Sequence, residues 1–160
     1  MSILKEIEST GVGVDISPYA IQNARENAVR FGFVPADPSS EDSCTSRVKF
    51  MLGDFARTYG KFESIVSNPP YIIPNPSNSI HKTALTDPPI ALFDAHDSSF
   101  SCYQQIIASD NLLPGGRIAF EIPEHALMDT IEFAEAYGFS HEFNKEIGRE
   151  IYMCILEKSK

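Results

Sequence analysis

The sequence predicts an α/β fold with a mostly parallel sheet. Short apolar runs typical of buried strands alternate with amphipathic helical patterns, which favours parallel strands joined by helices. The last two runs instead alternate apolar and polar residues around Gly148-Arg149, which indicates an antiparallel pair at the sheet edge. With 160 residues, the chain is long enough for one domain that buries about two-thirds of its unfolded surface.

The first part of the chain is predicted to hold a helix end, a strand and a helix. Apolar residues share one face over residues 2–9, and a short buried strand follows over 12–16. Ser17-Pro18 starts the next helix, because Ser is a favoured N-cap and Pro suits the first helical position. Gly32 is its expected C-cap. The apolar stripe of this helix would consist of Ile21, Ala24, Ala28 and Phe31.

The middle of the chain is predicted to hold two strands between two loops. Residues 33–46 are rich in Pro, Ser and Asp, so we expect an exposed loop. Strands are expected over 47–52 and over 62–67. Residues 73–97 are long and irregular, and a loop of this length beside a strand end predicts a substrate-facing segment.

The last third is predicted to end in the antiparallel pair. A helix over residues 98–113 leads into a turn at Pro114-Gly115-Gly116 and a strand over 117–122. A second amphipathic helix is expected over 124–137. The closing strands would cover residues 139–147 and 150–157.

Composition excludes several kinds of function. The formal charge of -9 argues against a nucleic-acid binder that relies on a basic face. The three cysteines (Cys44, Cys102 and Cys154) and the four histidines show no metal-ligand spacing, so we predict buried thiols and no metal site. No run reaches the ~18 apolar residues of a membrane span, and the N-terminal residues carry acids, unlike a targeting peptide.

Asn68-Pro69-Pro70-Tyr71 is the most specific motif. Two consecutive prolines cannot continue a sheet ladder, so Asn68 and Tyr71 are expected in a rigid turn at a strand's carboxyl end. Open α/β sheets bind ligands there. The Asn68 side-chain oxygen and the Pro69 carbonyl can accept both N–H groups of a planar amide or amine, on which Tyr71 can stack. These contacts would aim the nitrogen lone pair at an electrophile.

Two carboxylates follow earlier strands. Asp15 ends the strand over 12–16 and can accept hydrogen bonds from a ribose diol, or it can bond nearby backbone amides. Asp54 lies in Gly53-Asp54-Phe55 after the next strand. Its carboxylate can accept from an adenine amine while Phe55 covers the ring, or it can be a simple turn residue.

These three features in this order resemble the class I S-adenosylmethionine-dependent methyltransferases, whose sheet is Rossmann-like. More narrowly, the chain resembles the HemK/PrmC-type protein-(glutamine-N5) methyltransferases, which modify the Gly-Gly-Gln glutamine of peptide-chain release factors. The narrower resemblance rests on residues 13–18 with Ala20, on Asn27-Ala28, on residues 65–72, and on Asp87-Pro88 followed by Ala91-Leu92.

The resemblance implies S-adenosyl-L-methionine as cofactor and a release factor as protein substrate. Asp15 would hold the ribose, and Asp54 with the Phe55 backbone would read the adenine. Asn68 and Pro69 would bind the glutamine amide, with Tyr71 beside it. The implied substrate-binding and catalytic residues are thus Asn68, Pro69, Pro70 and Tyr71. Asn68 would also border the cofactor. A release factor as substrate implies a cytoplasmic or mitochondrial-matrix location.

The chain also departs from this family. Before Ser2 it lacks the first strand, the glycine-rich loop that receives the methionine part of the cofactor, and the helical domain that docks the release factor. We therefore expect residues 1–160 to be a partial catalytic domain that binds the cofactor weakly by itself. The family strand order is 3-2-1-4-5-7-6, so the strands over 12–16 and 62–67 would lack their shared neighbour. Ala95-His96 replaces common glycines, which puts the local loop conformation in question.

Two alternatives stay open. A nucleic-acid adenine-N6 methyltransferase must also methylate a planar nitrogen that is a poor nucleophile, and it uses the same motif. Such an enzyme would need base flipping and a basic recognition region. The acidic balance of this chain weighs against that interpretation. An inactive, truncated paralogue would act only as a binding module, and the missing glycine-rich loop favours it.

Overall fold

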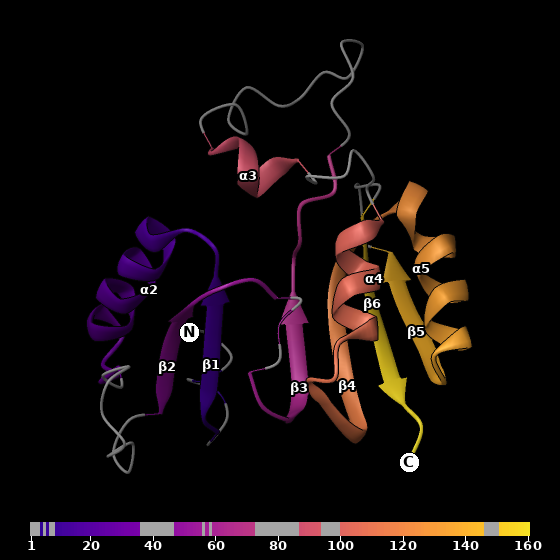
Figure 1. Cartoon of the computed structure of the whole chain (residues 1–160), viewed down its shortest axis with the longest axis horizontal. Helices are drawn as coiled ribbons and strands as arrows, with labels where there is room; N and C mark the ends of the chain where they lie inside the picture. The colour runs from indigo at the N-terminus through magenta and orange to yellow at the C-terminus, as the bar shows by residue number, and fades with distance from the viewer. Residues whose placement is uncertain are drawn as a thin grey trace. The chain divides into compact units, whose positions relative to one another are not determined.

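The computed structural model describes Leu4, Glu6, Arg57 and residues 9–35, 47–55, 59–72, 87–93, 100–145 and 151–160. Its contacts divide the chain into two compact units, Met1–Arg57 and Thr58–Lys160. Each unit has its own sheet, of two strands in the first and four strands in the second (Figure 1).

The first unit is built on two parallel strands. β1 (Gly11–Asp15) pairs with β2 (Val48–Leu52), in a register that sets Asp15 opposite Leu52. Helix α2 (Pro18–Arg30) joins the two strands and packs on them. The apolar core of this unit consists of Ile21, Ala28, Phe33, Val48 and Phe50, with Leu4 and Ala24 against it.

Local sequence signals set both ends of α2. The Ser17 side chain accepts the Ala20 backbone N–H at 3.3 Å, which confirms the predicted N-cap. The C-cap is Phe31 and not Gly32 as predicted; Gly32 is the next residue and has φ +81°, a conformation that favours glycine. Two further predictions here are wrong: Phe31 lies beyond the last helical turn and is 49% exposed, whereas Phe33, expected in an exposed loop, is buried in the core.

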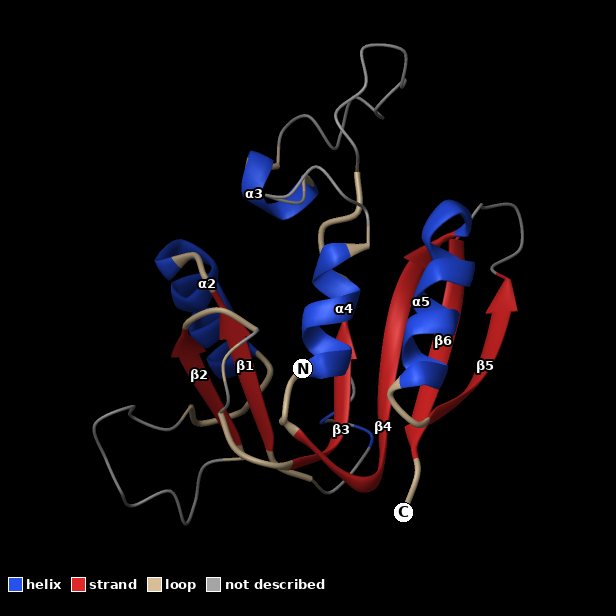
Figure 2. Ribbon diagram, turned by 45° about the vertical axis from the view of Figure 1, so that its right-hand side comes forward, coloured by secondary structure: helices blue, strands red, loops and turns tan. Residues whose placement is uncertain are grey.

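The second unit is a four-stranded mixed sheet with two helices against it. Its strand order is β3 (Phe62–Ser67), β4 (Leu112–Pro123), β6 (Ile151–Lys158) and β5 (Phe139–Lys145). β3 is parallel to β4, and the other pairs are antiparallel, so the predicted closing hairpin strands are confirmed. Helices α4 (Ser101–Ala108) and α5 (Glu124–Ala136) lie along the same face of this sheet (Figures 1 and 2).

The core of the second unit lies between that face and the two helices. Ile118, Phe120 and Ile122 alternate along β4 and are fully buried, as a strand with one covered face requires. The other buried residues of β6 and the two helices are Cys154, Leu156, Tyr103, Ile106, Ile107, Ala126, Leu127, Thr130, Ile131 and Ala134.

The boundary between α4 and β4 differs from the prediction. The helix ends at Ala108 and not at residue 113, because both the hydroxyl and the backbone N–H of Ser109 turn back to the Ile106 carbonyl. β4 starts at Leu112 and includes the expected glycine turn as an irregularity in its register. A Cβ on Gly116 would lie 2.9 Å from the Glu63 carbonyl oxygen, so only glycine fits there.

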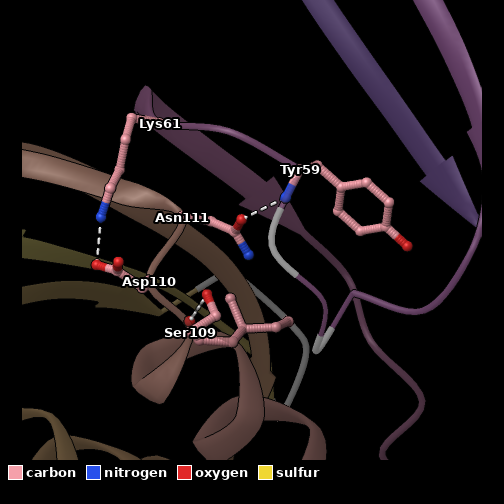
Figure 3. Close-up of polar contacts among 6 residues, drawn as sticks. Tyr59, Lys61, Ser109, Asp110 and Asn111 are labelled. Carbon is pink, nitrogen blue, oxygen red and sulfur yellow. Dashed lines mark hydrogen bonds and ion pairs between the residues drawn. The ribbon is translucent and has the colours of Figure 1, made fainter.

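Asn111 fixes the start of β3 to the end of α4. Its side-chain oxygen accepts the Tyr59 backbone N–H at 2.9 Å (Figure 3). Its carbonyl accepts the Phe62 N–H at 2.8 Å. Lys61 forms an ion pair with Asp110 beside it. Asn111 is 5% exposed, so this short polar segment replaces the helical turn that the sequence predicted.

The strand orders agree with the expected sheet. The order β2–β1 matches the 3-2 part of the order 3-2-1-4-5-7-6, and β3–β4–β6–β5 matches its 4-5-7-6 part; the described residues contain no strand that corresponds to the central one. Among the described residues, β1 and β3 each pair with a single strand. Within the same residues, no helix combines the length and the apolar character needed to cross a membrane.

Some predictions fall on residues outside the described ranges. The turn at Gly148-Arg149, Cys44 and the Ala95-His96 position are among them. Of the stretch over 73–97, expected to be irregular, the structure describes residues 87–93, which contain the short helix α3 (Pro89–Leu92). Pro at the first helical position gives this helix its start.

Candidate active site

Asn68 stands at the carboxyl end of β3, where the sequence places it. The strand ladder ends at the Ser67–Phe120 pair, and Asn68-Pro69-Pro70 continues without regular structure. Pro69 is buried and Pro70 half-buried, whereas the Asn68 side chain is exposed. The prolines thus seat the turn against the unit and leave the Asn68 amide at the surface.

The Asn68 side chain is held by Glu121, a residue of β4. Asn68 Nδ2 donates a hydrogen bond to Glu121 Oε1 at 3.0 Å. A carboxylate only accepts, so it faces the amide nitrogen and leaves the Asn68 oxygen on the other side. No described residue donates to that oxygen or to the Pro69 carbonyl, so both remain available as acceptors.

Tyr71 lies beside the same carboxylate. Its hydroxyl donates to Glu121 Oε1 at 3.3 Å, and its side chain is half-buried. Below it, the hydroxyl of the fully buried Tyr103 donates to the Glu121 backbone carbonyl at 3.0 Å. Burial, together with nearby ionisable groups of which Tyr71 is the strongest, raises the pKa of Tyr103 far above its usual range. Tyr103 is therefore a neutral donor that fixes the strand end.

The end of the motif is tied to α3. The Ile72 backbone N–H donates to the Leu92 carbonyl at 3.0 Å, and Ile72 forms a parallel bridge with Phe93. Two segments that the sequence singled out separately, Asn68–Tyr71 and the Ala91-Leu92 stretch, are thereby joined. The tertiary structure places part of the predicted substrate-facing loop next to the Asn68–Tyr71 turn.

Asp15 and Asp54 lie in the first unit, at the ends of neighbouring strands. The Gly53 N–H donates to the Asp15 carbonyl at 2.9 Å, so the two strand ends adjoin. Asp15 is exposed, and its Oδ1 accepts the Ser17 backbone N–H at 2.8 Å. The bond to a nearby backbone amide that the sequence analysis considered for Asp15 is thus present, through one carboxylate oxygen. Asp54 and Phe55 are both half-buried in the turn after β2.

The structure thus describes two groups of predicted site residues, one in each unit. Asn68, Pro69, Pro70 and Tyr71 form one turn, and Asp15, Asp54 and Phe55 follow adjacent strands. The sequence analysis missed Glu121, which lies inside a strand and carries no motif signal of its own. Among the described residues, no group of three His, Cys, Asp or Glu side chains is placed to hold a metal ion.

Curated relatives are similar to this chain in sequence. The chain is 31% identical over 156 residues to the release factor glutamine methyltransferase of Flavobacterium psychrophilum, which covers 95% of the chain and 50% of that protein. It is 37% identical over 128 residues to the release factor glutamine methyltransferase of Bradyrhizobium diazoefficiens, covering 76% and 38%. The chain spans about half, or less, of the length of these relatives. No protein-family model matches it.

A solved structure shares the fold. The methyltransferase of Pyrococcus furiosus superposes with a TM-score of 0.62 at 18% identity, over 100% of this chain and 69% of that one. At this identity the likeness shows the fold alone, that of a Rossmann-like methyltransferase. The chain is thus similar in sequence to release factor glutamine methyltransferases over most of its own length, and its strand orders agree with the sheet of a Rossmann-like methyltransferase.

Proposed function

We propose that this chain forms the amide-binding and cofactor-binding parts of a methyltransferase that acts on a glutamine side chain. The substrate would be the Gly-Gly-Gln glutamine of a peptide-chain release factor, and the methyl donor S-adenosyl-L-methionine. The observation that carries this proposal is the orientation of Asn68, whose nitrogen is bound to Glu121 and whose oxygen is left open at a strand end.

The nitrogen of a glutamine amide is a poor nucleophile, because its lone pair is delocalised into the carbonyl group. Asn68 Oδ1 and the Pro69 carbonyl can each accept one of its N–H groups, which fixes the amide in one orientation. The same two oxygens stabilise the positive charge that develops on this nitrogen in the transition state. No strong base is required, because the nitrogen releases a proton to solvent once it carries the methyl group.

The cofactor-binding part would consist of Asp15, Asp54 and Phe55. Carboxylates only accept hydrogen bonds, and they match the donors that a ribose diol and an adenine amine present. Asp15 Oδ1 is occupied by the Ser17 N–H, but the side chain is exposed at the strand end and has a second oxygen for a hydroxyl. When bound, S-adenosyl-L-methionine supplies a methyl group on a positively charged sulfur, and S-adenosylhomocysteine leaves as that S–C bond breaks.

The location follows from the proposed substrate. Release factors act where ribosomes translate, so we propose the cytoplasm or the mitochondrial matrix for this chain.

The test is methyl transfer from radiolabelled S-adenosyl-L-methionine by the full chain. The substrates are a release-factor domain with Gly-Gly-Gln, the same domain with Gly-Gly-Glu, and an adenine-containing DNA duplex. We expect label only in the first, and a loss of about 100-fold or more in Asn68→Ala. Asn144→Ala, an exposed asparagine on β5, is the matched control and should keep the wild-type rate.

Other outcomes contradict the proposal. Label in the DNA duplex would support an adenine methyltransferase. No label in any substrate, together with retained binding of the release-factor domain, would make the chain a binding module.

A further inference from the structure

Glu121 gathers two of the proposed active-site side chains at one oxygen. Asn68 Nδ2 and the Tyr71 hydroxyl both donate to its Oε1, at 3.0 Å and 3.3 Å. The donors come from the turn after β3, and the acceptor comes from β4. The amide-binding turn is therefore connected by side chains to the neighbouring strand.

The backbone of Glu121 is fixed on several sides. Its strand neighbour Phe120 pairs with Ser67 of β3, and Glu121 itself lies opposite Met153 of β6. Its carbonyl accepts the hydroxyl of Tyr103, which is fully buried and packs edge-on against the Phe120 ring with centroids 5.1 Å apart. The carboxylate therefore extends from a rigid point.

An exposed asparagine needs such a contact if its amide is to present one defined face. The last side-chain torsion of asparagine is broad and nearly two-fold, so the amide can turn over and exchange its oxygen for its nitrogen. In the reversed state Asn68 would present N–H groups toward the N–H groups of a substrate, and no hydrogen bond could form. A carboxylate next to Nδ2 excludes that state, because it has no hydrogen to donate to Oδ1.

We propose that Glu121 is a positioning residue, which holds Asn68 with its oxygen toward the substrate amide and strengthens that oxygen as an acceptor. This proposal rests on the function proposed above. A donor that is bound to an anion polarises the rest of its amide, so Asn68 Oδ1 carries more negative charge than it would alone. Glu121 would thus act on the substrate nitrogen through Asn68, without touching it.

The test compares Glu121→Gln with Glu121→Asp and with Glu157→Gln in the full chain. Glutamine keeps the size of the side chain but offers both a donor and an acceptor, so it no longer excludes the reversed Asn68 amide. Aspartate keeps the charge on a shorter side chain. Glu157 is the matched control, because it is a carboxylate on the same sheet whose partner is Arg117, at 2.8 Å.

Two measurements distinguish a role of Glu121 in positioning Asn68 from a role in the stability of the fold alone. The side-chain amide signals of Asn68 in ¹⁵N–¹H NMR spectra should shift in Glu121→Gln and stay in place in Glu157→Gln. In methyl transfer, Glu121→Gln should lower kcat by about 10- to 100-fold with an unchanged KM for the cofactor and an unchanged melting temperature. Glu121→Asp should recover part of that loss.

The outcomes distinguish this inference from the proposed function. Unchanged Asn68 signals in Glu121→Gln would overturn the inference, and so would a kcat loss that merely follows a lower melting temperature. If the wild-type chain methylates no glutamine substrate, the proposed function fails. The Asn68 signals still decide whether Glu121 orients the amide.

Discussion

The carboxylate of Asp15 accepts the backbone N–H of Ser17 at 2.8 Å, so the proposed ribose-binding residue also shapes the turn into α2. The two roles can be separated. Asp15→Asn keeps an oxygen for the Ser17 N–H but loses the charge, whereas Asp15→Ala loses both. We expect Asp15→Asn to keep the free energy of unfolding within ~0.5 kcal/mol, and Asp15→Ala to lower it by about 1 kcal/mol.

Both Asp15 variants should weaken cofactor binding about 10-fold or more, since each removes a charged acceptor. The measurement is an NMR titration with millimolar S-adenosylhomocysteine that follows the backbone amides of residues 15–17 and 53–55. Asp129→Asn, at an exposed position on α5, is the control. Equal affinity in Asp15→Asn and the wild type would remove Asp15 from the proposed cofactor site.

Tyr71 is expected to act mainly through its ring. Its hydroxyl bond to Glu121, at 3.3 Å, is long, so Tyr71→Phe should reduce methyl transfer by no more than about 5-fold. Tyr71→Ala removes the surface that would pack beside the substrate amide and should cost more than about 10-fold. Tyr152→Phe provides the control, because its hydroxyl makes a similar bond to Glu124 at 3.4 Å. A larger loss in Tyr71→Phe than in Tyr71→Ala would be inconsistent with a role for the ring.

Asn111 should matter for stability and not for chemistry. Asn111→Ala leaves the Tyr59 N–H without the acceptor that it has at 2.9 Å, and the position is 5% exposed. We expect the free energy of unfolding to fall by about 1–3 kcal/mol in urea denaturation. Asn144→Ala, on the exposed strand β5, should change it by no more than ~0.5 kcal/mol. Equal effects in the two variants would refute this role for Asn111.

Cys154 should make stability fall in alkaline solution. Burial raises the pKa of its thiol from 9.0 to about 11. The unfolded chain releases this proton near pH 9 while the folded chain keeps it, so the stabilisation is present below about pH 9 and is lost toward about pH 11. The difference in unfolding free energy between the wild type and Cys154→Ala should therefore shrink between pH 8 and pH 10.5. Taking the difference between the two proteins cancels the contribution of Tyr103, which both contain. A difference that stays constant with pH would contradict a raised pKa of the Cys154 thiol.

Local signals in the sequence determined where several helices and strands begin and end, and where Asn68 lies. Ser17-Pro18 sets the start of α2, because an N-cap needs only its own side chain and the first helical turn. The double proline after Ser67 ends β3 for an equally local reason, the lack of backbone N–H groups. The apolar runs predicted the strands, the family resemblance implied their order in each sheet, and Asn68 lies at the strand end that its motif predicted.

Contacts between segments that are distant in the sequence decided the features that the sequence analysis missed. Phe33 is buried because Ile21, Ala28, Val48 and Phe50 surround the place to which the chain returns after α2. The end of α4 depends on Asn111, whose partners Tyr59 and Phe62 belong to another segment. Glu121 meets Asn68 across 53 residues of sequence, because the pairing of β3 with β4 brings their carboxyl ends together. The sequence motif placed the Asn68 amide at a strand end, but the register between β3 and β4 selects Glu121 as the residue that binds it.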